Sequence, residues 1–426
     1  MSRGRTASST LLVVVITITA FNLRPVVTSI GPVLRELQVG LGMSDTVAGV
    51  LTSLPVVCFG VVGLLAGRIG RRVGVERALV VGLVLLAGGM LVRSQVTSAW
   101  VFLLVSFLAL TGAAVGNVLL PVLVKRWFPG RVGTLTGVYS MSVISATALP
   151  AVLTVPLAAW LGGWEFGLAI WALPALLALI PWMLVTRSEV GDRGLPPAVP
   201  PGGRDRRVHH SRQAWALAVY FGLQSLEAYT VMGWLPAILR DAGLSPTRSG
   251  VLLGVAMAIG APLALLLPSM AARRPDQRPL VAGLIVASVG GYVGLILAPA
   301  VAPTVWIVLL GIGLGAFPLA LVLIGLRSAT SQGTAGLSSL TQGVGYLIAA
   351  LGPITVGALH DRTGGWEWPI GILAVLLIPK LWAGLIAAAP GFVDRADTAL
   401  DDHRETTGQR RQRRQRGSRG SRGSRG

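Results

Sequence analysis

The sequence predicts an all-α membrane protein with twelve transmembrane helices arranged as two six-helix halves. Of its 426 residues, 53% are hydrophobic and only 12% are charged, and the mean hydropathy is +0.71. Soluble domains of this length do not show such a balance. Long apolar runs recur along the chain, six before and six after one polar stretch rich in Pro, Gly and Arg. The arginines fall mainly in the short connections between the runs, in the polar stretch and in the tail Arg410 to Gly426, which is typical of membrane topology.

The first apolar run extends from Leu11 to about Leu37. It exceeds the roughly 20 residues that a helix needs to cross a bilayer, so we expect a retained span rather than a signal peptide. Arg24 lies in its middle, where an arginine costs at least about 2.5–3.5 kcal/mol on insertion. Pro25 follows directly and removes one helical hydrogen bond. We therefore expect a bent first helix that presents the Arg24 guanidinium to a cavity.

The remaining runs divide the chain into four segments. The first half is expected to end at residue 185 and the second to cover 212–390, with a cytoplasmic linker at 186–211 and a disordered basic cytoplasmic tail at 391–426. The further spans are expected at about residues 46–66, 78–92, 100–123, 133–157, 166–185, 214–239, 250–270, 280–298, 304–325, 335–359 and 369–389.

The distribution of positive residues predicts the orientation. If the N-terminus is inside, the arginine-rich connections and the linker are all inside as well. The outer connections then hold only Arg35, Arg93, Arg240, Arg248 and Arg362. Because positive residues concentrate in cytoplasmic loops, we expect a multi-pass protein of the cytoplasmic (cell inner) membrane with both termini in the cytoplasm. The net charge of +19 is thereby explained without a nucleic-acid partner.

The two halves also resemble each other in sequence. Residues 42–51 match residues 243–252 at an offset of 201, and Arg72 matches Arg273 at the same offset. Chance similarity between apolar helices is the alternative explanation. Parallel six-span repeats of this kind are typical of major facilitator transporters, so the repeat favours that fold.

Short motifs occur in a fixed order over both halves. They are Asn22-Leu23-Arg24-Pro25 with Gly31-Pro32, and those at residues 54–60, 126–129, 222–226, 234–236, 317–321 and 357–361. In this order and spacing they resemble the cyanate/2-nitroimidazole permease (CynX/NimT) family of the major facilitator superfamily. The resemblance implies a secondary active permease that works by alternating access.

The connection after the second span departs from the pattern usual in that superfamily. Gly63, Arg68, Gly70, Arg71 and Arg72 match the pattern, but Gly67 stands where an aspartate is usual. We expect Arg68, Arg71 and Arg72 to form the gating loop, with the alternative that these arginines serve topology alone.

Two charges lie deep inside apolar runs, and they occupy similar depths in the first helix of each half. Arg24 is the basic one, and Glu227 is the only acid placed within a span. The functional interpretation is an anion-binding site at Arg24 and a proton-coupling acid at Glu227. The alternative is a structural ion pair or polar gate. Lys380 lies in the last span near its cytoplasmic half, from where its side chain can extend to the interface, so it is not assigned to the site.

Seven further polar residues are candidates for substrate binding, although polar side chains in membrane helices often bond only to neighbouring helices. Gln342 and Tyr346 are four residues apart and share a helix face. The candidates are Asn22, Asn117, Tyr139, Gln224, Tyr229, Gln342 and Tyr346.

Enzyme chemistry finds little support in the sequence. All four histidines (His209, His210, His360 and His403) fall outside the spans, and no hydrolase, nucleotide-binding or metal motif occurs. We expect no enzyme, cofactor or metal. The expected function is a monomeric permease for a small anionic or nitro/heteroaromatic solute, embedded in lipid, with protons as the candidate coupling ion. The alternative is a non-transporting membrane receptor of the same fold.

Overall fold

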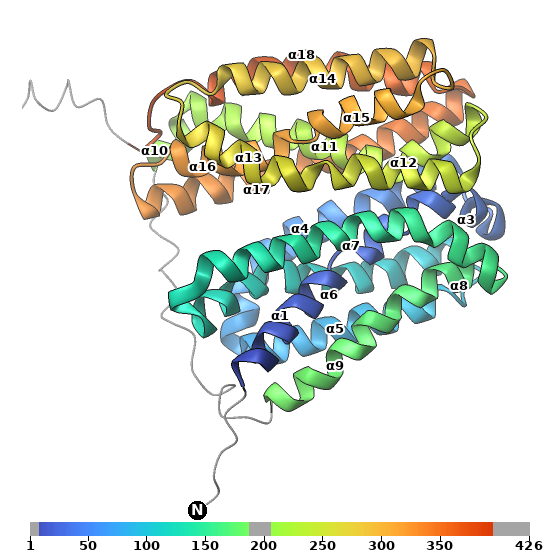
Figure 1. The fold of residues 1–426 in the computed structure, drawn as a ribbon, viewed down its shortest axis with the longest axis horizontal. Helices are drawn as coiled ribbons and strands as arrows, with labels where there is room; N and C mark the ends of the chain where they lie inside the picture. The colour runs from blue at the N-terminus through green and yellow to red at the C-terminus, as the bar shows by residue number, and fades with distance from the viewer. Residues whose placement is uncertain (1–7, 187–205, 395–426) are drawn as a thin grey trace, which may run out of the picture.

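The computed structural model describes residues 8–186 and 206–394, and these form two helix bundles lying side by side (Figure 1). The first half, blue to green, comprises α1 to α9. Its helices are α1 (Ser9–Asn22), α2 (Pro25–Thr28), η1 (Gly31–Val33), α3 (Leu34–Leu41), α4 (Asp45–Val73), α5 (Val75–Arg93), α6 (Ala99–Trp127), η2 (Pro129–Arg131), α7 (Val132–Leu161), α8 (Trp164–Ala169), η3 (Ile170–Ala172) and α9 (Leu173–Thr186).

The second half, lime to red in Figure 1, comprises α11 to α18. A short helix, α10, lies within the predicted linker, whose residues 187–205 are outside the described part, as are residues 395–426 of the predicted tail. The helices are α10 (Arg206–His210), α11 (Arg212–Asp241), α12 (Pro246–Ala258), α13 (Gly260–Ala272), α14 (Arg278–Leu297), α15 (Pro303–Gly313), α16 (Ala316–Leu326), α17 (Ser331–Thr363) and α18 (Glu367–Ala387).

In the described part of the chain twelve helical segments cross the bundle, five of them built from two or more consecutive helices. In the described residues, eleven segments are long and apolar enough to span a membrane. The twelfth is α11, the helix that carries Gln224, Glu227 and Tyr229. Most of its residues are buried between other helices, so it does not need an apolar surface toward lipid. The predicted fold class is confirmed.

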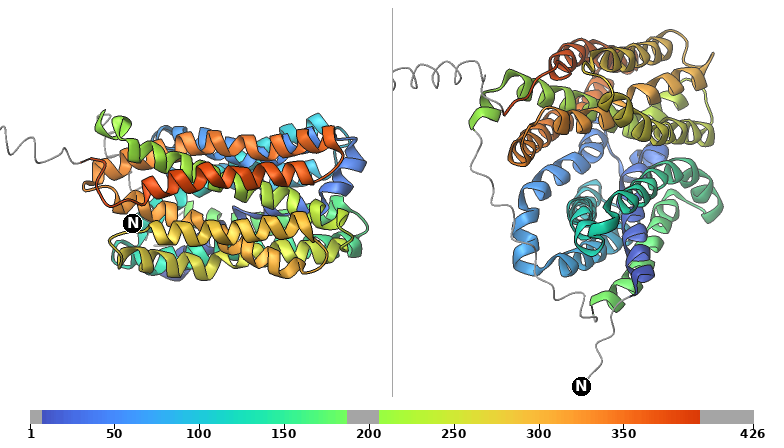
Figure 2. Two further views of the ribbon diagram at one scale, coloured as in Figure 1. Left: turned by 90° about the horizontal axis from the view of Figure 1, so that it is seen from above. Right: turned by 60° about the vertical axis from the view of Figure 1, so that its left-hand side comes forward.

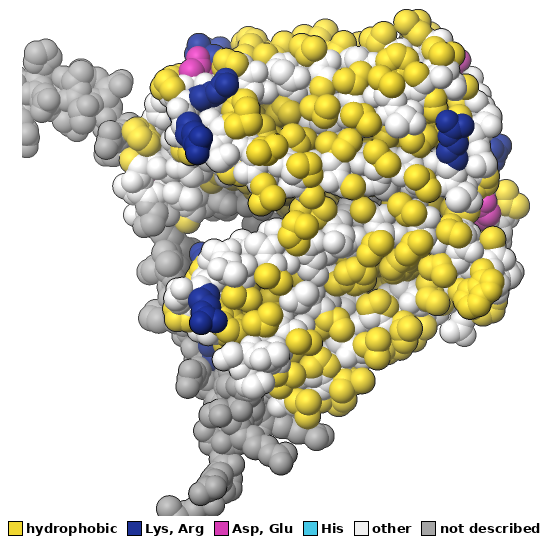
Figure 3. All heavy atoms as spheres, in the orientation of Figure 1, with side chains coloured by type: hydrophobic (Ala, Val, Ile, Leu, Met, Phe, Trp, Pro, Cys, Tyr) yellow, Lys and Arg dark blue, Asp and Glu magenta, His cyan; other side chains and the backbone are white. Residues whose placement is uncertain are grey.

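On the face that Figure 3 shows, the flank is largely apolar and the exposed charged side chains lie toward the two ends of the bundle. Large side chains such as Trp160 and Leu347 are 79% and 74% exposed. In a soluble protein so much exposed apolar surface would promote aggregation, whereas here it contacts lipid tails.

The two halves meet along α4 and α17 and along α7 and α12. At one end, where α3 is followed by α4 and α17 by α18, the halves are in contact; we call this the closed end. At the opposite end, where α10 lies, the surface is hollowed between the halves (Figure 3); we call this the open end. Figure 2 shows the same two lobes from other directions.

At the open end the chain after α18 folds back onto its own half. Arg327 donates hydrogen bonds from its Nε to the carbonyl of Ala387 at 3.1 Å and from its Nη2 to that of Ala388 at 2.8 Å. These carbonyls lie at the C-terminus of α18, where a positive charge is favourable. The Asp394 carboxylate accepts hydrogen bonds from the N–H groups of Ala329 and Thr330 just before α17. Residues 388–394 are thereby fixed to the second half.

Candidate functional site

A break in the first span positions the central arginine. α1 ends at Asn22 and α2 begins at Pro25, so Leu23 and Arg24 lie between two helices. Pro25 has no N–H to continue α1. The carbonyl of Val26 accepts a hydrogen bond from Nη1 of the fully buried Arg93 at 3.1 Å. The predicted bend at Pro25 is therefore confirmed, and a side chain from α5 stabilises it.

Aromatic side chains from both halves surround Arg24. Its guanidinium carbon lies 5.8 Å from the ring centroid of Phe59 on α4, a cation–π arrangement. The hydroxyl of Tyr229 on α11 is within hydrogen-bonding range of the guanidinium. Tyr139 on α7 and Tyr346 on α17 lie close enough to interact with the same charge. The three tyrosines expected from the sequence thus gather around the expected arginine.

Arg24 has no acidic partner. Within residues 8–186 and 206–394, no carboxylate forms an ion pair with it. A guanidinium offers five N–H donors and no acceptor, and Phe59 covers one face without satisfying any of them. A half-buried cation without a carboxylate partner is poised to bind an anion.

The aromatic side chains extend beyond the tyrosines. The Phe59 and Tyr346 rings lie 6.5 Å apart, Phe221 packs edge-on against Tyr346 at 5.4 Å, and Phe317 lies 5.9 Å from Phe221. Sequence reasoning did not assign the three phenylalanines to the site. Phe59 and Phe317 lie in two of the family motifs, which is the only signal that could have marked them.

Four other candidates do not contact this group. Asn22 is buried and donates to the carbonyls of Ile18 and Pro174, at 2.7 and 3.1 Å. Gln224 is fully buried and donates to the Ser225 hydroxyl at 2.7 Å. Gln342 donates to the Ser338 hydroxyl at 2.7 Å. Asn117 is half-buried on α6. Binding roles for these residues stay predictions.

Glu227 does not approach Arg24 but pairs with Lys380 of α18. The two side chains are 4% and 1% exposed, so Lys380 does not extend to the interface, and that expectation was wrong. The Ser288 hydroxyl of α14 donates to the same carboxylate at 3.0 Å, and Tyr292 also lies in contact with it. Glu227 therefore joins α11, α14 and α18 inside the second half.

Comparison with known proteins identifies the family to which the chain belongs. The profile of the Major Facilitator Superfamily matches residues 10–350. The chain belongs to this superfamily. It is 37% identical over 382 residues to the uncharacterized transporter YycB of Bacillus subtilis (89% of this chain, 93% of the relative).

Two further relatives identify the group within the superfamily. The 2-nitroimidazole transporter of Escherichia coli K12 is 36% identical over 385 residues (88% and 95%). The cyanate transport protein CynX of the same organism is 33% identical over 387 residues (87% and 99%). A bacterial homologue of the lysosomal transporter Spinster, solved in an inward-facing conformation, shares the fold with a TM-score of 0.69 at 16% identity, covering 90% and 95% of the two chains. The chain is thus a permease of the CynX/NimT family.

The predicted gating arginines of this permease lie at the open end of α4. Arg72 is exposed, and the side chains of Arg68 and Arg71 lie outside the described part. A nearby ion pair joins Arg126 and Glu76 at 2.9 Å within the first half. The gating role of the three arginines stays a prediction.

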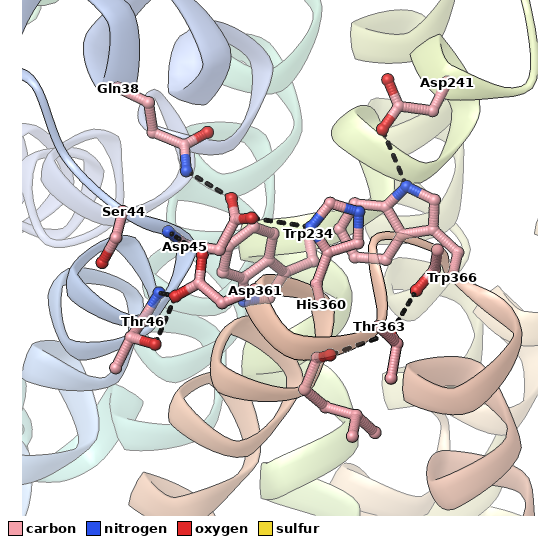
Figure 4. A network of polar contacts seen from close by, with 12 residues as sticks. Gln38, Ser44, Asp45, Thr46, Trp234, Asp241, His360, Asp361, Thr363 and Trp366 are labelled. Carbon is pink, nitrogen blue, oxygen red and sulfur yellow. Dashed lines mark hydrogen bonds and ion pairs between the residues drawn. The ribbon is translucent and has the colours of Figure 1, made fainter.

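At the closed end, polar contacts connect the two halves (Figure 4). The Asp361 carboxylate on α17 accepts hydrogen bonds from the N–H groups of Asp45 and Thr46, at 3.0 and 2.7 Å, and from the Thr46 hydroxyl. It therefore caps the N-terminus of a helix in the other half. Two further ion pairs cross the same end: Arg35 with Asp241 at 2.8 Å, and Arg240 with both Glu36 oxygens at 2.9 and 2.8 Å.

Glycines allow the helices to approach at this end. A Cβ on Gly49 of α4 would lie 2.6 Å from the carbonyl oxygen of Pro353 on α17, and one on Gly357 would overlap the carbonyl of Asp45. Such distances are shorter than any side chain tolerates. The closed end is therefore packed backbone against backbone.

Proposed function

We propose that this permease moves a small planar monoanion, or a nitro-substituted heteroaromatic solute, through a site centred on Arg24. The observation that carries the proposal is the unpaired guanidinium of Arg24, surrounded by side chains from four helices of both halves. In alternating access, a substrate bound between the halves is exposed to one compartment and then to the other.

The charge of the site favours a single negative charge on the substrate. One guanidinium is available, and no second cation is among the described groups that interact with Arg24 and its tyrosines. A dianion would keep one uncompensated charge in a poorly solvated place, which is strongly unfavourable. The planar N–H edge of arginine matches two oxygens held in one plane, as in a carboxylate or a nitro group.

The walls of the site favour a flat, conjugated substrate. Phe59, Tyr346 and Phe221 present aromatic rings next to the guanidinium, and such rings stack on other π systems. Relatives named for 2-nitroimidazole and cyanate transport support this inference, because a nitroheteroaromatic ring and cyanate are both planar or linear and conjugated.

The orientation and the energy source complete the proposal. We infer that the open end faces the cytoplasm, because the arginine-rich connections lie there.

The sequence has no nucleotide-binding motif, so a gradient drives transport. Glu227 is proposed as the coupling acid because it is the only acid buried deep in a span, and its contact with Lys380 makes the proposal testable.

The test uses purified protein in detergent and in vesicles. Benzoate, cyclohexanecarboxylate and phthalate differ in aromaticity or charge at similar size. We expect benzoate to give the largest thermal stabilisation, since a ligand stabilises the form that it binds. Arg24→Lys keeps the charge but loses the planar fork, so affinity should fall at least about tenfold; Arg24→Ala should lose binding and uptake.

Arg126→Lys is the matched control, because it makes the same change at an arginine outside the site. It should bind like the wild type. Normal binding and uptake by a correctly inserted Arg24→Ala protein would contradict the proposal. Equal binding of benzoate and cyclohexanecarboxylate would be consistent with the anion site but would contradict the preference for aromatic substrates.

A further inference from the structure

One histidine of the closed end lies between an acid and an indole ring. Nδ1 of His360 lies 2.7 Å from Oδ2 of Asp45, and its ring stacks on that of Trp366 with centroids 4.0 Å apart and an angle of 23° (Figure 4). The side chains of His360 and Asp45 are 18% and 23% exposed. The contact is therefore partly shielded from water but open to protons.

Both neighbours can interact favourably with a positive charge. The Asp45 carboxylate attracts the positive charge directly. The π face of Trp366 also attracts a cation, in the arrangement called cation–π. Histidine is the side chain that ordinarily changes charge between about pH 5 and 8, so the strength of this contact depends on pH within the physiological range.

The contact joins the two halves. Asp45 is the first residue of α4 in the first half, while His360 lies near the end of α17 in the second. Opening the closed end separates the two residues, since α4 and α17 form the line along which the halves meet. Separation also removes Asp361 from the N-terminus of α4.

Other charged groups at this end are arranged around the same histidine but do not form a polar contact with its ring. Asp241, at the end of α11, accepts a hydrogen bond from Nε1 of Trp366 at 2.8 Å. The charged groups of the neighbouring elements are Asp361 and Arg362 of α17, Arg240 and Asp241 of α11, Arg35 and Glu36 of α3, Asp45 of α4 and Glu367 of α18.

We propose that His360, Asp45 and Trp366 form a latch between the halves that holds the closed end shut more firmly as the pH falls. The sign follows from linkage. In the closed state the Asp45 carboxylate of the other half lies against the imidazolium, and opening removes it; Trp366 belongs to the same half as His360 and does not distinguish the two states. A proton thus binds more tightly to the closed state, and acidification shifts the population toward that state. The latch acts on the conformational equilibrium, independently of what the permease carries.

The test measures the separation of the halves in detergent, where both ends meet the same pH. Spin labels are placed at Val39→Cys on α3 and Val301→Cys in the connection between α14 and α15; both positions are 82% exposed. The buried native cysteine, Cys58, is replaced by alanine. Between about pH 8 and pH 5.5, the ratio of closed to open distances should rise roughly two- to fivefold, the range that one partly exposed ion pair supports.

The latch variant is His360→Gln, which retains a polar side chain that cannot become charged. Its ratio should no longer change with pH. The matched control, His209→Gln on α10 at the open end, should respond like the wild type. Asp45→Asn, which leaves the histidine without its carboxylate, should weaken the response and serves as the second variant if His360→Gln does not fold. A full pH response in both folded variants would overturn the latch, whatever the permease transports.

Discussion

At the scale of single residues, the contact of Glu227 with Lys380 is the costliest feature of the second half. Two charges are removed from water, and their attraction compensates for this only when their other hydrogen-bonding sites are also satisfied. The Ser288 hydroxyl supplies part of that here. Because the three helices α11, α14 and α18 converge on this carboxylate, the pair can serve as a structural staple, as a proton site, or as both.

A double substitution distinguishes these roles. Glu227→Gln leaves the Lys380 ammonium buried without its partner, so it should lower the free energy of unfolding by about 3–5 kcal/mol. Adding Lys380→Met should restore most of the loss, as measured by thermal unfolding in detergent. If Glu227 carries the coupling proton, the restored double variant should exchange substrate in counterflow but fail to accumulate it under a pH gradient. Accumulation with undiminished pH dependence would make Glu227 purely structural.

Site residues that are polar and lie inside apolar runs could be predicted from the sequence. Arg24 and the three tyrosines stood out as polar groups inside apolar runs, and the structure brings them together. Phe59 and Phe221 could not be found in this way, because an aromatic ring in an apolar run has no contrast with its neighbours. The partner of Glu227 lies 153 residues further along the chain, and only the packing of α11 against α18 reveals it.

At the scale of helices, the glycines of the closed end determine how near α4 and α17 can come. Gly49→Ala places a methyl group against the Pro353 carbonyl. The two helices can relieve this overlap only by separating, so we expect the population to shift toward a state open at this end. The distance between labels at Val39→Cys and Val301→Cys measures the shift.

Gly63→Ala is the control on the same helix, since a Cβ at Gly63 meets nothing within 4 Å. It should leave the distances unchanged. If Gly49→Ala gives the same distances as Gly63→Ala, close helix approach does not control the closed end.

The cap on α17 makes a separate prediction at this scale. Burial raises the pKa of the Asp394 carboxyl. Hydrogen bonds from Ala329 and Thr330 lower this pKa by more, so it lies below the ordinary value of 3.8. A lowered folded pKa means that the carboxylate stabilises the fold above pH 3.8 and that this stabilisation is lost as the pH falls through the folded value. Asp394→Asn should cost about 1 kcal/mol at neutral pH.

The thermal unfolding midpoints of wild type and Asp394→Asn, measured from neutral to acid pH, check this. The difference between them should shrink toward zero under strongly acidic conditions. A difference that stays constant over the whole range would show that ionisation of the Asp394 carboxyl does not contribute to the stability of the cap.

The spans could be predicted from apolar runs, and the break in the first span from Pro25, whereas the breaks in two spans of the second half could not be predicted. α12 ends at Ala258 and α13 begins at Gly260; α15 ends at Gly313 and α16 begins at Ala316. Glycine is common inside membrane helices, so its presence alone does not mark a break. At Gly315 an added Cβ would lie 2.7 Å from Leu263, which shows that packing of α16 against α13 selects this position.

At the scale of the whole molecule, the sequence predicts topology but not conformation. Six spans before and six after the linker follow from hydropathy and the repeat. Hydropathy and the repeat do not reveal which end is closed and which is hollow, since an alternating-access protein adopts both arrangements with the same sequence.

The proposed orientation is tested by reporters fused at the two ends. A reporter placed after Gly203 should lie in the cytoplasm, and one after Gly364, next to the latch, should lie outside. Alkaline phosphatase, which is active only outside the cytoplasm, should therefore be inactive at the first position and active at the second. The opposite result at either position would refute the orientation.

The wide separation of Glu227 and Lys380 in the chain has a consequence during synthesis. The ribosome delivers α11 to the translocon long before α18, because 153 residues separate the two partners. At roughly 5–20 residues per second, Glu227 is synthesised about 8–30 s before Lys380. During that time α11, which carries this carboxyl group, has to remain beside the hydrated translocon instead of partitioning into lipid. Biogenesis of the second half thus depends on the last helix to emerge, and a chain truncated before Lys380 should be a substrate for membrane quality-control proteases.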